Sequence, residues 1–234
     1  KQYITAGAVC GAMLAISVNF QQFGISAYPA GTAAEARSGF ITALYVVFVP
    51  LLSFFFGKKV SPVIWASVAV AVVGFYMLCL SGGISGIYTA DILVFICAFC
   101  FAGQIISVDK FVGLTGGVKL SVMQFTVAGA LSAVFAVIFE SPTMENIIAA
   151  APQILYLGIV SSGVGYTLQI VGQKYAEPSV ASLSMSLESV FAALGGWLIS
   201  GNTLSPRELI GCTVVFAAII VAQLPEIARG RKKA

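Results

Sequence analysis

Few side chains of this 234-residue chain could do chemistry, and most of them lie inside long apolar stretches. Tyr166 and Gln169 share one helical face of a late stretch. Asn19 and Gln22 occupy the matching positions of the first stretch, and Gln104 lies in a third. Polar groups in such stretches either line a polar cavity or hydrogen-bond to a neighbouring helix. For the matched pair Gln22 and Gln169 both interpretations stay open, whereas a lone serine favours the hydrogen bond.

Glu188 is the most informative single residue, because it lies near the middle of a mostly apolar stretch and no other acidic residue lies so deep. A carboxyl group at such depth is neutral unless it is paired, since burial disfavours the charged form. It could take up and release a proton while a solute crosses a membrane, or it could hold two helices together. The proton-exchanging role is the favoured hypothesis.

The sequence carries no signature of an enzyme. It contains no His, which is the commonest general base and metal ligand. Cys97 and Cys100 form a C-x-x-C pair, but without His and without a second pair they do not predict a metal or redox site. No G-x-S-x-G, H-E-x-x-H or phosphate-binding glycine loop is present. We therefore predict that the protein is not an enzyme and that it uses no metal and no cofactor.

The composition indicates the environment in which these side chains lie. Hydrophobic residues make up 59% of the chain and charged residues 9%, with a mean hydropathy of +1.00, whereas a soluble domain carries about 25% charged residues. This excludes a water-soluble globule and a basic nucleic-acid-binding protein. We predict an all-α polytopic protein in the lipid bilayer, with eight transmembrane helices at 3–27, 32–56, 60–80, 91–112, 119–139, 153–173, 179–200 and 205–225.

Local signals mark the starts of several of these helices. Thr32 to Glu35 and Ser205 to Glu208 are typical of capping boxes. Ser61-Pro62 and Ser141-Pro142 fit an N-cap followed by proline at the first helical position. Pro50 is expected to kink the second span.

The positive charges predict the orientation. If the N-terminus is cytoplasmic, ten of the twelve Lys and Arg residues lie on the cytoplasmic side, and Arg37 and Arg207 lie outside. Both termini are then cytoplasmic, and the membrane is the inner or plasma membrane of the cell. Arg37, near the outer interface, could meet an anionic substrate, but snorkelling of its side chain towards water is the favoured interpretation.

An internal repeat is visible at low similarity. A Gly…Ser-Pro pattern at 57–62 recurs 144 residues later, and span one matches span six at an offset of 147. Spans one to three thus correspond to spans six to eight, and a five-helix unit would place two copies inverted in the membrane. Spans four and five have no counterparts after Lys1, so we expect two preceding helices and ten in the complete protein. The expected units are a truncated first repeat at 1–80, a second repeat at 81–228 and a basic tail at 229–234.

Several segments have a familiar order and spacing, at 155–169, 187–197 and 204–211, with further ones at 40–50 and 57–62. Together they resemble the EamA-type members of the drug/metabolite transporter superfamily. The resemblance covers essentially the whole chain and implies ten helices in two inverted five-helix copies, with both ends cytoplasmic. Ser189 stands where the family usually has Pro after the glutamate, so span seven is expected to be more continuous here.

These observations and the resemblance predict a secondary transporter. It would move small organic metabolites or drugs by alternating access, as an exporter, with proton coupling as an option. Glu188 would be the protonation site, and the other substrate contacts would come from Asn19, Gln22, Gln104, Tyr166 and Gln169.

Three alternative functions stay open beside this prediction, and so does the formation of a homodimer. The first alternative is a non-transporting accessory or structural membrane protein. An intramembrane enzyme would need a catalytic cluster that the sequence does not show, and a channel would need a filter motif. Gly7 and Gly11 are spaced for close helix contact, either at an internal seam or in a homodimer, and the internal seam is favoured.

Overall fold

The computed structural model describes residues 2–30, 34–80, 87–140, 142–191, 194 and 205–231. Within these residues every regular element is a helix, as the sequence predicts. One of them, η1, is a π-helix. The elements are α1 (Gln2–Ser26), α2 (Ala34–Ala43), α3 (Tyr45–Phe55), α4 (Pro62–Cys79), α5 (Thr89–Thr115), α6 (Gly117–Phe139), α7 (Met144–Ala149), α8 (Ala151–Leu155), η1 (Tyr156–Tyr166), α9 (Thr167–Gln173), α10 (Pro178–Met185) and α12 (Pro206–Arg231).

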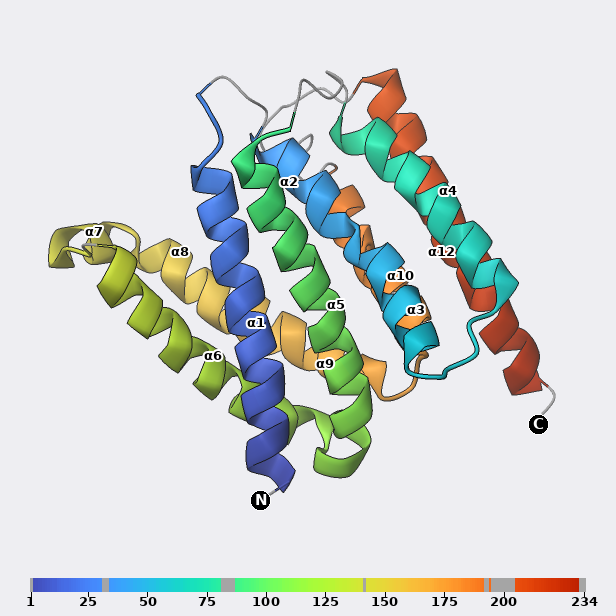
Figure 1. Cartoon of the computed structure of the whole chain (residues 1–234), viewed down its shortest axis with the longest axis horizontal. Coiled ribbons are helices and arrows are strands. Elements are labelled where there is room, and N and C mark those ends of the chain that lie inside the picture. Colours follow the sequence, from blue (N-terminus) through green and yellow to red (C-terminus); the bar gives the residue numbers. More distant parts are fainter. Residues whose placement is uncertain are drawn as a thin grey trace.

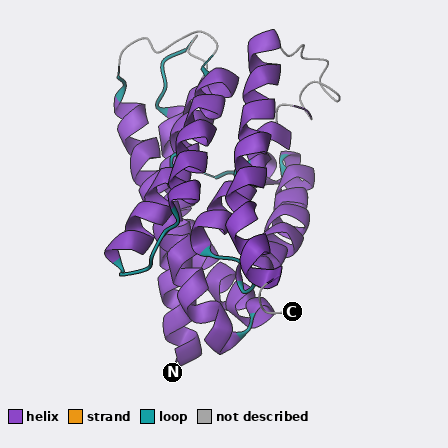
Figure 2. Cartoon of the chain, turned by 90° about the vertical axis from the view of Figure 1, so that its right-hand side faces the viewer, coloured by secondary structure: helices purple, strands orange, loops and turns teal. Residues whose placement is uncertain are grey.

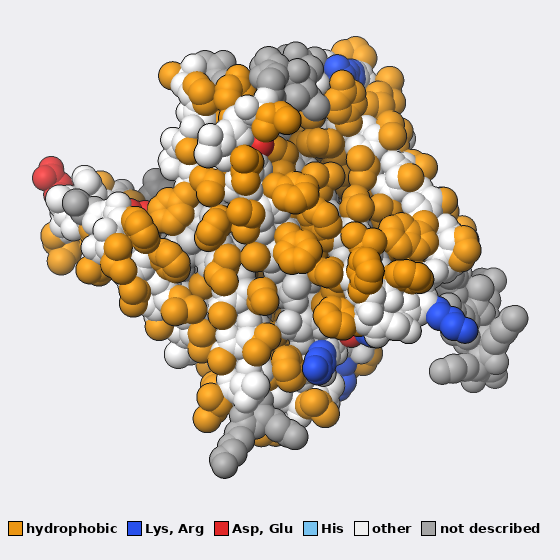
Figure 3. Space-filling view, in the orientation of Figure 1, with side chains coloured by type: hydrophobic (Ala, Val, Ile, Leu, Met, Phe, Trp, Pro, Cys, Tyr) orange, Lys and Arg blue, Asp and Glu red, His pale blue; other side chains and the backbone are white. Residues whose placement is uncertain are grey.

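Seven helical segments of the described chain are long and apolar enough to cross a membrane. They agree with seven of the eight predicted spans to within a few residues, and Figure 3 shows apolar side chains over most of the visible face. The eighth predicted span, 179–200, lies partly outside the described residues. The seven segments are Tyr3–Ser26, Ala36–Phe55, Pro62–Cys79, Thr89–Thr115, Gly117–Phe139, Ala151–Gln173 and Pro206–Leu224.

The long helices run between the two ends of a bundle, and the start of α1 and the end of α12 lie at the same end (Figure 1). The α3–α4, α5–α6 and α9–α10 connections lie at that end too. We call it the lysine end, because the connections and the adjoining helix termini carry Lys58, Lys59, Lys110, Lys119 and Lys174. Arg37 and Arg207, at the starts of α2 and α12, lie at the opposite end, here called the arginine end. The charges thus segregate as the sequence predicts.

Glycines allow the closest helix contacts. A Cβ added at Gly7 or Gly11 of α1 would lie 2.6 Å from the Cβ of Met123 or Val127 of α6. This places the predicted small-residue seam inside the chain. At the edge of the bundle α4 packs against α12 (Figure 2), where a Cβ at Gly211 would lie 2.8 Å from the Gly74 carbonyl oxygen.

Helix starts follow the predicted signals where the structure describes them. The Ser61 side chain accepts a hydrogen bond from the Val63 N–H, with Pro62 at the first helical position of α4. At α12 the Ser205 N–H donates to Glu208 Oε2 at 2.7 Å, and the Glu208 N–H donates to Ser205 Oγ at 3.3 Å, which is a capping box. The signals at Thr32 and Ser141 lie outside the described residues.

Two predicted spans are interrupted near their centres. The second is divided at Leu44 into α2 and α3, so the interruption precedes Pro50 instead of coinciding with it. In the seventh, α10 ends at Met185, and a turn at Ser186 precedes a second helical segment at 187–191. The expected continuity of this span is therefore wrong, because the turn comes three residues before Ser189. Both interruptions lie near the middle of the bundle.

Candidate functional site

A cavity of about 100 Å³ lies where these interrupted spans meet α5 and the end of η1. Its walls combine amide, hydroxyl, carboxyl, thioether and apolar groups. They come from α1, α2, α3, α5, η1, α9, α10 and the segment 187–191. We call it the central cavity, and its lining residues are Gln21, Thr42, Tyr45, Phe101, Gln104, Ile105, Tyr166, Gln169, Met185 and Glu188.

The interruptions place polar side chains at the cavity wall. Tyr45 is the first residue of α3, directly after the break at Leu44. Glu188 follows the turn at Ser186 by two residues. Tyr166 and Gln169 lie on either side of the junction at which η1 gives way to α9. π-Helical turns occur frequently at functional sites, and this one ends beside the cavity.

Four of the six predicted site residues line this cavity: Gln104, Tyr166, Gln169 and Glu188. Gln104 is 1% exposed, and its Nε2 donates to Gln124 Oε1 of α6 at 3.0 Å. The two interpretations of a buried amide therefore coexist at Gln104, which both bonds to a neighbouring helix and faces the cavity. Glu188 is an exposed side chain that makes no hydrogen bond or ion pair with the part of the chain that the structure describes.

The other two predicted residues lie outside the cavity. Asn19 Nδ2 donates to Ser132 Oγ of α6 and to the Ala15 carbonyl, both at 2.8 Å. Asn19 therefore makes an interhelical hydrogen bond. Gln22 is exposed and does not contribute to the cavity wall. Its neighbour Gln21 lines the cavity instead, and its Nε2 donates to Thr42 Oγ1 at 3.2 Å.

Three further residues line the cavity that were not predicted from the sequence: Gln21, Thr42 and Tyr45. The offset of 147 selects Gln22 as the partner of Gln169 and passes over Gln21 by one residue. Because one residue turns a helix by about 100°, this error moves the choice to a different face. Thr42 and Tyr45 flank the break in the second span. Residues 42–45 contain no Gly or Pro, so the sequence does not indicate a break there.

The predicted snorkelling of Arg37 is wrong. Arg37 is 8% exposed, and its guanidinium donates through Nε to Asp91 Oδ1 at 2.6 Å and through Nη2 to Asp91 Oδ2 at 2.5 Å. The Tyr28 hydroxyl donates to the same carboxylate at 2.6 Å, and the guanidinium carbon lies 4.7 Å from the centre of the Tyr88 ring. Burial raises the pKa of Tyr28, and its bond to Asp91 raises this pKa further, so the hydroxyl stays a donor. This cluster joins α2 to α5 at the arginine end.

The sequence of the later helices matches a known family. Residues 88–223, which include α5 and every later lining residue of the central cavity, match the EamA-like transporter family. The chain belongs to the EamA-like transporter family. It is therefore a multi-pass membrane protein, and the resemblance found in the sequence is confirmed.

Two curated relatives match a longer part of the chain. An Archaeoglobus fulgidus protein, named uncharacterized transporter, is 32% identical over 189 residues, which cover 80% of this chain and 60% of that protein. Uncharacterized transporter YcbK of Bacillus subtilis (strain 168) is 22% identical over 210 residues, which cover 84% of this chain and 67% of that protein. The chain thus spans about three-fifths of the first relative.

A solved crystal structure shares the arrangement of helices. It superposes with a TM-score of 0.71 over 96% of this chain and 89% of the other, at 16% sequence identity. At this identity the likeness concerns the fold alone. It extends over α1 to α4 as well as over the family match.

Proposed function

We propose that this EamA family member is a secondary transporter and that the central cavity is its substrate site. The observation that carries the proposal is the composition of the cavity wall. Amide, hydroxyl and carboxyl groups from distant parts of the chain converge inside an otherwise apolar membrane bundle. Polar groups at this depth are typical of solute pathways. Gln104, Tyr166, Gln169 and Glu188, together with Gln21, Thr42 and Tyr45, would contact a small organic metabolite or drug.

Proton coupling through Glu188 is the second part of the proposal. The Glu188 carboxyl group lines the cavity, and among the described residues no Lys or Arg lines it. A proton is therefore the simplest partner for its charge when the cavity closes around a solute. Gain and loss of this proton would let a proton gradient drive export by alternating access.

The internal repeat supports alternating access. Spans two and seven, which the repeat relates, are both interrupted near the cavity, at Leu44 and at Ser186. Spans three and eight, also related, pack on each other through Gly74 and Gly211. Such repeats favour sites near the membrane midplane between the two copies. We infer that residues 1–80 and 81–228 belong to two inverted five-helix repeats, with span seven making this chain an eight-helix protein.

Orientation completes the proposal. The segregation of charge between the lysine and arginine ends supports a cytoplasmic lysine end, in the inner or plasma membrane. The homodimer stays a prediction. Gly7 and Gly11, which could have formed its interface, pack against α6 of the same chain.

Flux through liposomes tests the proposal. The purified protein would be reconstituted, a pH gradient imposed, and a panel of amino acids, nucleosides, sugars and cationic drugs followed by mass spectrometry. We expect one solute class to move, faster with the gradient than without it. Folded and correctly inserted protein that moves none of them would contradict the proposal and favour the accessory-protein alternative.

A further inference from the structure

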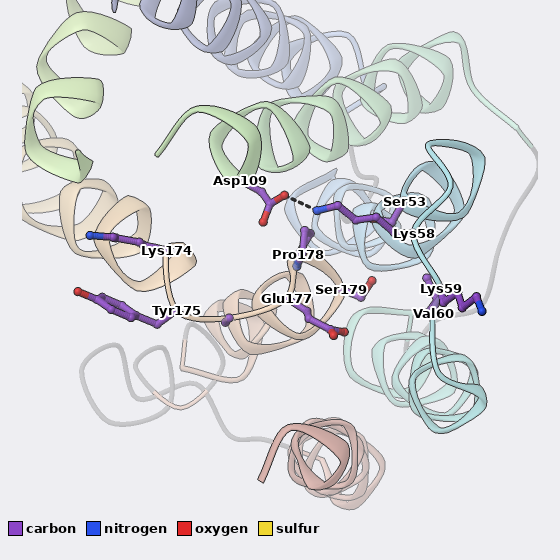
Figure 4. A pocket seen from close by; sticks show the side chains of 11 residues that line it. Ser53, Lys58, Lys59, Val60, Asp109, Lys174, Tyr175, Glu177, Pro178 and Ser179 are labelled. Carbon is purple, nitrogen blue, oxygen red and sulfur yellow. Dashed lines mark hydrogen bonds and ion pairs between the residues drawn. The ribbon is translucent and has the colours of Figure 1, made fainter. Parts of the chain in front are cut away.

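A second and larger cavity, of about 500 Å³, lies at the lysine end. We call it the lysine-end cavity. Its walls come from the end of α3, the α3–α4 connection, α5, the α9–α10 connection and the start of α10 (Figure 4). The lining residues are Ser53, Lys58, Lys59, Val60, Asp109, Lys174, Tyr175, Ala176, Glu177, Pro178 and Ser179.

The two cavities are lined by the same three helices. On α3, Tyr45 lines the central cavity and Ser53 the lysine-end cavity, eight residues or about 12 Å further along. On α5 the corresponding residues are Ile105 and Asp109, one turn apart. α10 runs from Ser179 at the lysine-end cavity to Met185 at the central cavity. These helices contact one another, so the cavities lie one above the other along a common axis.

A tightly packed apolar layer separates the two cavities. Val49 of α3 is fully buried, and Ile105 of α5 is 3% exposed. Leu52 and Met185 pack against the same cluster. On α3, Val49 and Leu52 lie between the positions that line the two cavities. Ile105 and Met185 also line the central cavity, at its edge towards the lysine end. A solute that travelled along this axis would have to part this layer, because its members pack together in one cluster.

An ion pair holds the layer at its lysine-end side. Lys58 Nζ donates to Asp109 Oδ2, which joins the α3–α4 connection to α5 (Figure 4). The Lys59 side chain points away from Asp109 in the same view. The Lys58 side chain is 50% exposed and that of Asp109 is 23% exposed. A pair that is this accessible to water is weak and salt-sensitive, which suits a contact that must break and reform.

We propose that the lysine-end cavity is the inner part of the solute pathway, and that the layer of Val49, Leu52, Ile105 and Met185, held by the Lys58–Asp109 ion pair, is its closed gate. This inference rests on the proposed function, because a gate has meaning only on a transport pathway. It adds the route and the closing device to the central site. The described conformation is then the one in which the central cavity is shut towards the lysine end.

Cysteine labelling tests the gate without measuring transport. Thr42→Cys places a thiol on the central cavity wall, and a membrane-impermeant maleimide is supplied from the lysine side only. Labelling of the native cysteines, measured in the parent protein, is subtracted. We expect slow labelling of T42C, and labelling about two- to fivefold faster when Lys58→Glu is added, because an exposed ion pair biases an equilibrium by about this factor.

Charge exchange and a neighbouring lysine supply the controls. The double exchange Lys58→Asp with Asp109→Lys remakes the pair and should restore slow labelling. Lys110→Glu changes the same charge on the residue next to Asp109, outside the cavity wall, and should leave the rate unchanged. An unchanged rate in K58E, an equal increase in K110E, or fast labelling in the double exchange would each overturn the proposal.

The apolar layer has its own test. Ile105→Ala removes side-chain volume from the layer and should speed the labelling of T42C from the lysine side while Lys58 and Asp109 stay paired. Slow labelling of folded I105A protein would overturn the assignment of the layer as the gate. These readouts report access to the central cavity and not flux. A protein that transports nothing would fail the liposome test, whereas a transporter without this gate would fail the labelling test alone.

Discussion

At the scale of single residues, two ion pairs that each involve an aspartate differ in their surroundings. Arg37 and Asp91 have side chains about 10% exposed, and Tyr28 and the Tyr88 N–H also donate to the carboxylate. Lys58 and Asp109 are more open to water. The two aspartates therefore form a matched comparison of a buried and an exposed pair.

We expect Asp91→Asn to destabilise the protein by about 3 kcal/mol, because it leaves the Arg37 charge buried without its counter-charge. Asp109→Asn should cost less than about 1 kcal/mol, since Lys58 can turn to water. Thermal unfolding in detergent measures both variants. Equal losses of stability would contradict the difference in burial.

Single residues also show which part of the site could be predicted from the sequence and which part could not. A polar residue inside an apolar stretch can be recognised without knowing how its helix is rotated. This is why the sequence predicts Glu188, Gln104, Tyr166 and Gln169. Gln21 and Gln22 are adjacent and of the same type, so only the rotation of α1 against its neighbours decides which faces the cavity. That rotation is a property of packing, which the sequence pattern does not specify. Asp91 was passed over for a similar reason, since its partner Arg37 lies 54 residues away.

At the scale of elements, the glycine seam between α1 and α6 gives a sharp stability test. Gly11→Ala would place its Cβ 2.6 Å from the Val127 Cβ and 2.7 Å from the Gln124 carbonyl oxygen. The two helices must then separate, at a cost of about 1–3 kcal/mol. The control is Gly129→Ala in α6, which meets nothing within 4 Å and should be neutral or stabilising by up to about 1 kcal/mol. Both follow from denaturation in detergent, and a stabilised G11A protein would refute the seam.

Helix lengths were predictable and helix interruptions were not. Membrane thickness sets the length of each span, and Gly, Pro and charged residues mark its limits. The break at Leu44 and the turn at Ser186 carry no such marker, and the π-helical period of η1 leaves no trace in the sequence pattern. Pro50 misled the expectation for the second span, since the interruption lies six residues earlier. These irregular positions are also the ones that shape the central cavity.

At the scale of the whole molecule, the orientation predicts opposite labelling of two cysteines. Gly230→Cys, near the end of α12, should react with an impermeant thiol reagent from the cytoplasmic side only. Ile87→Cys, in the α4–α5 connection and 85% exposed, should react from the outside only. The charge segregation is the physical reason. Reaction of the G230C protein from outside would reverse the orientation and with it the assignment of the lysine end as the inner end.

The central claim is that Glu188 in the central cavity couples proton movement to solute movement. Its most direct test is the flux of the transported solute in liposomes, with and without a pH gradient, for the parent protein, Glu188→Gln and Glu145→Gln. Glu145 is an exposed acid on α7, so E145Q controls for the loss of one carboxyl group. We predict that E188Q folds and inserts but loses the response to the gradient, while E145Q keeps it. A parent-like pH response in E188Q would contradict the account and leave Glu188 a structural role.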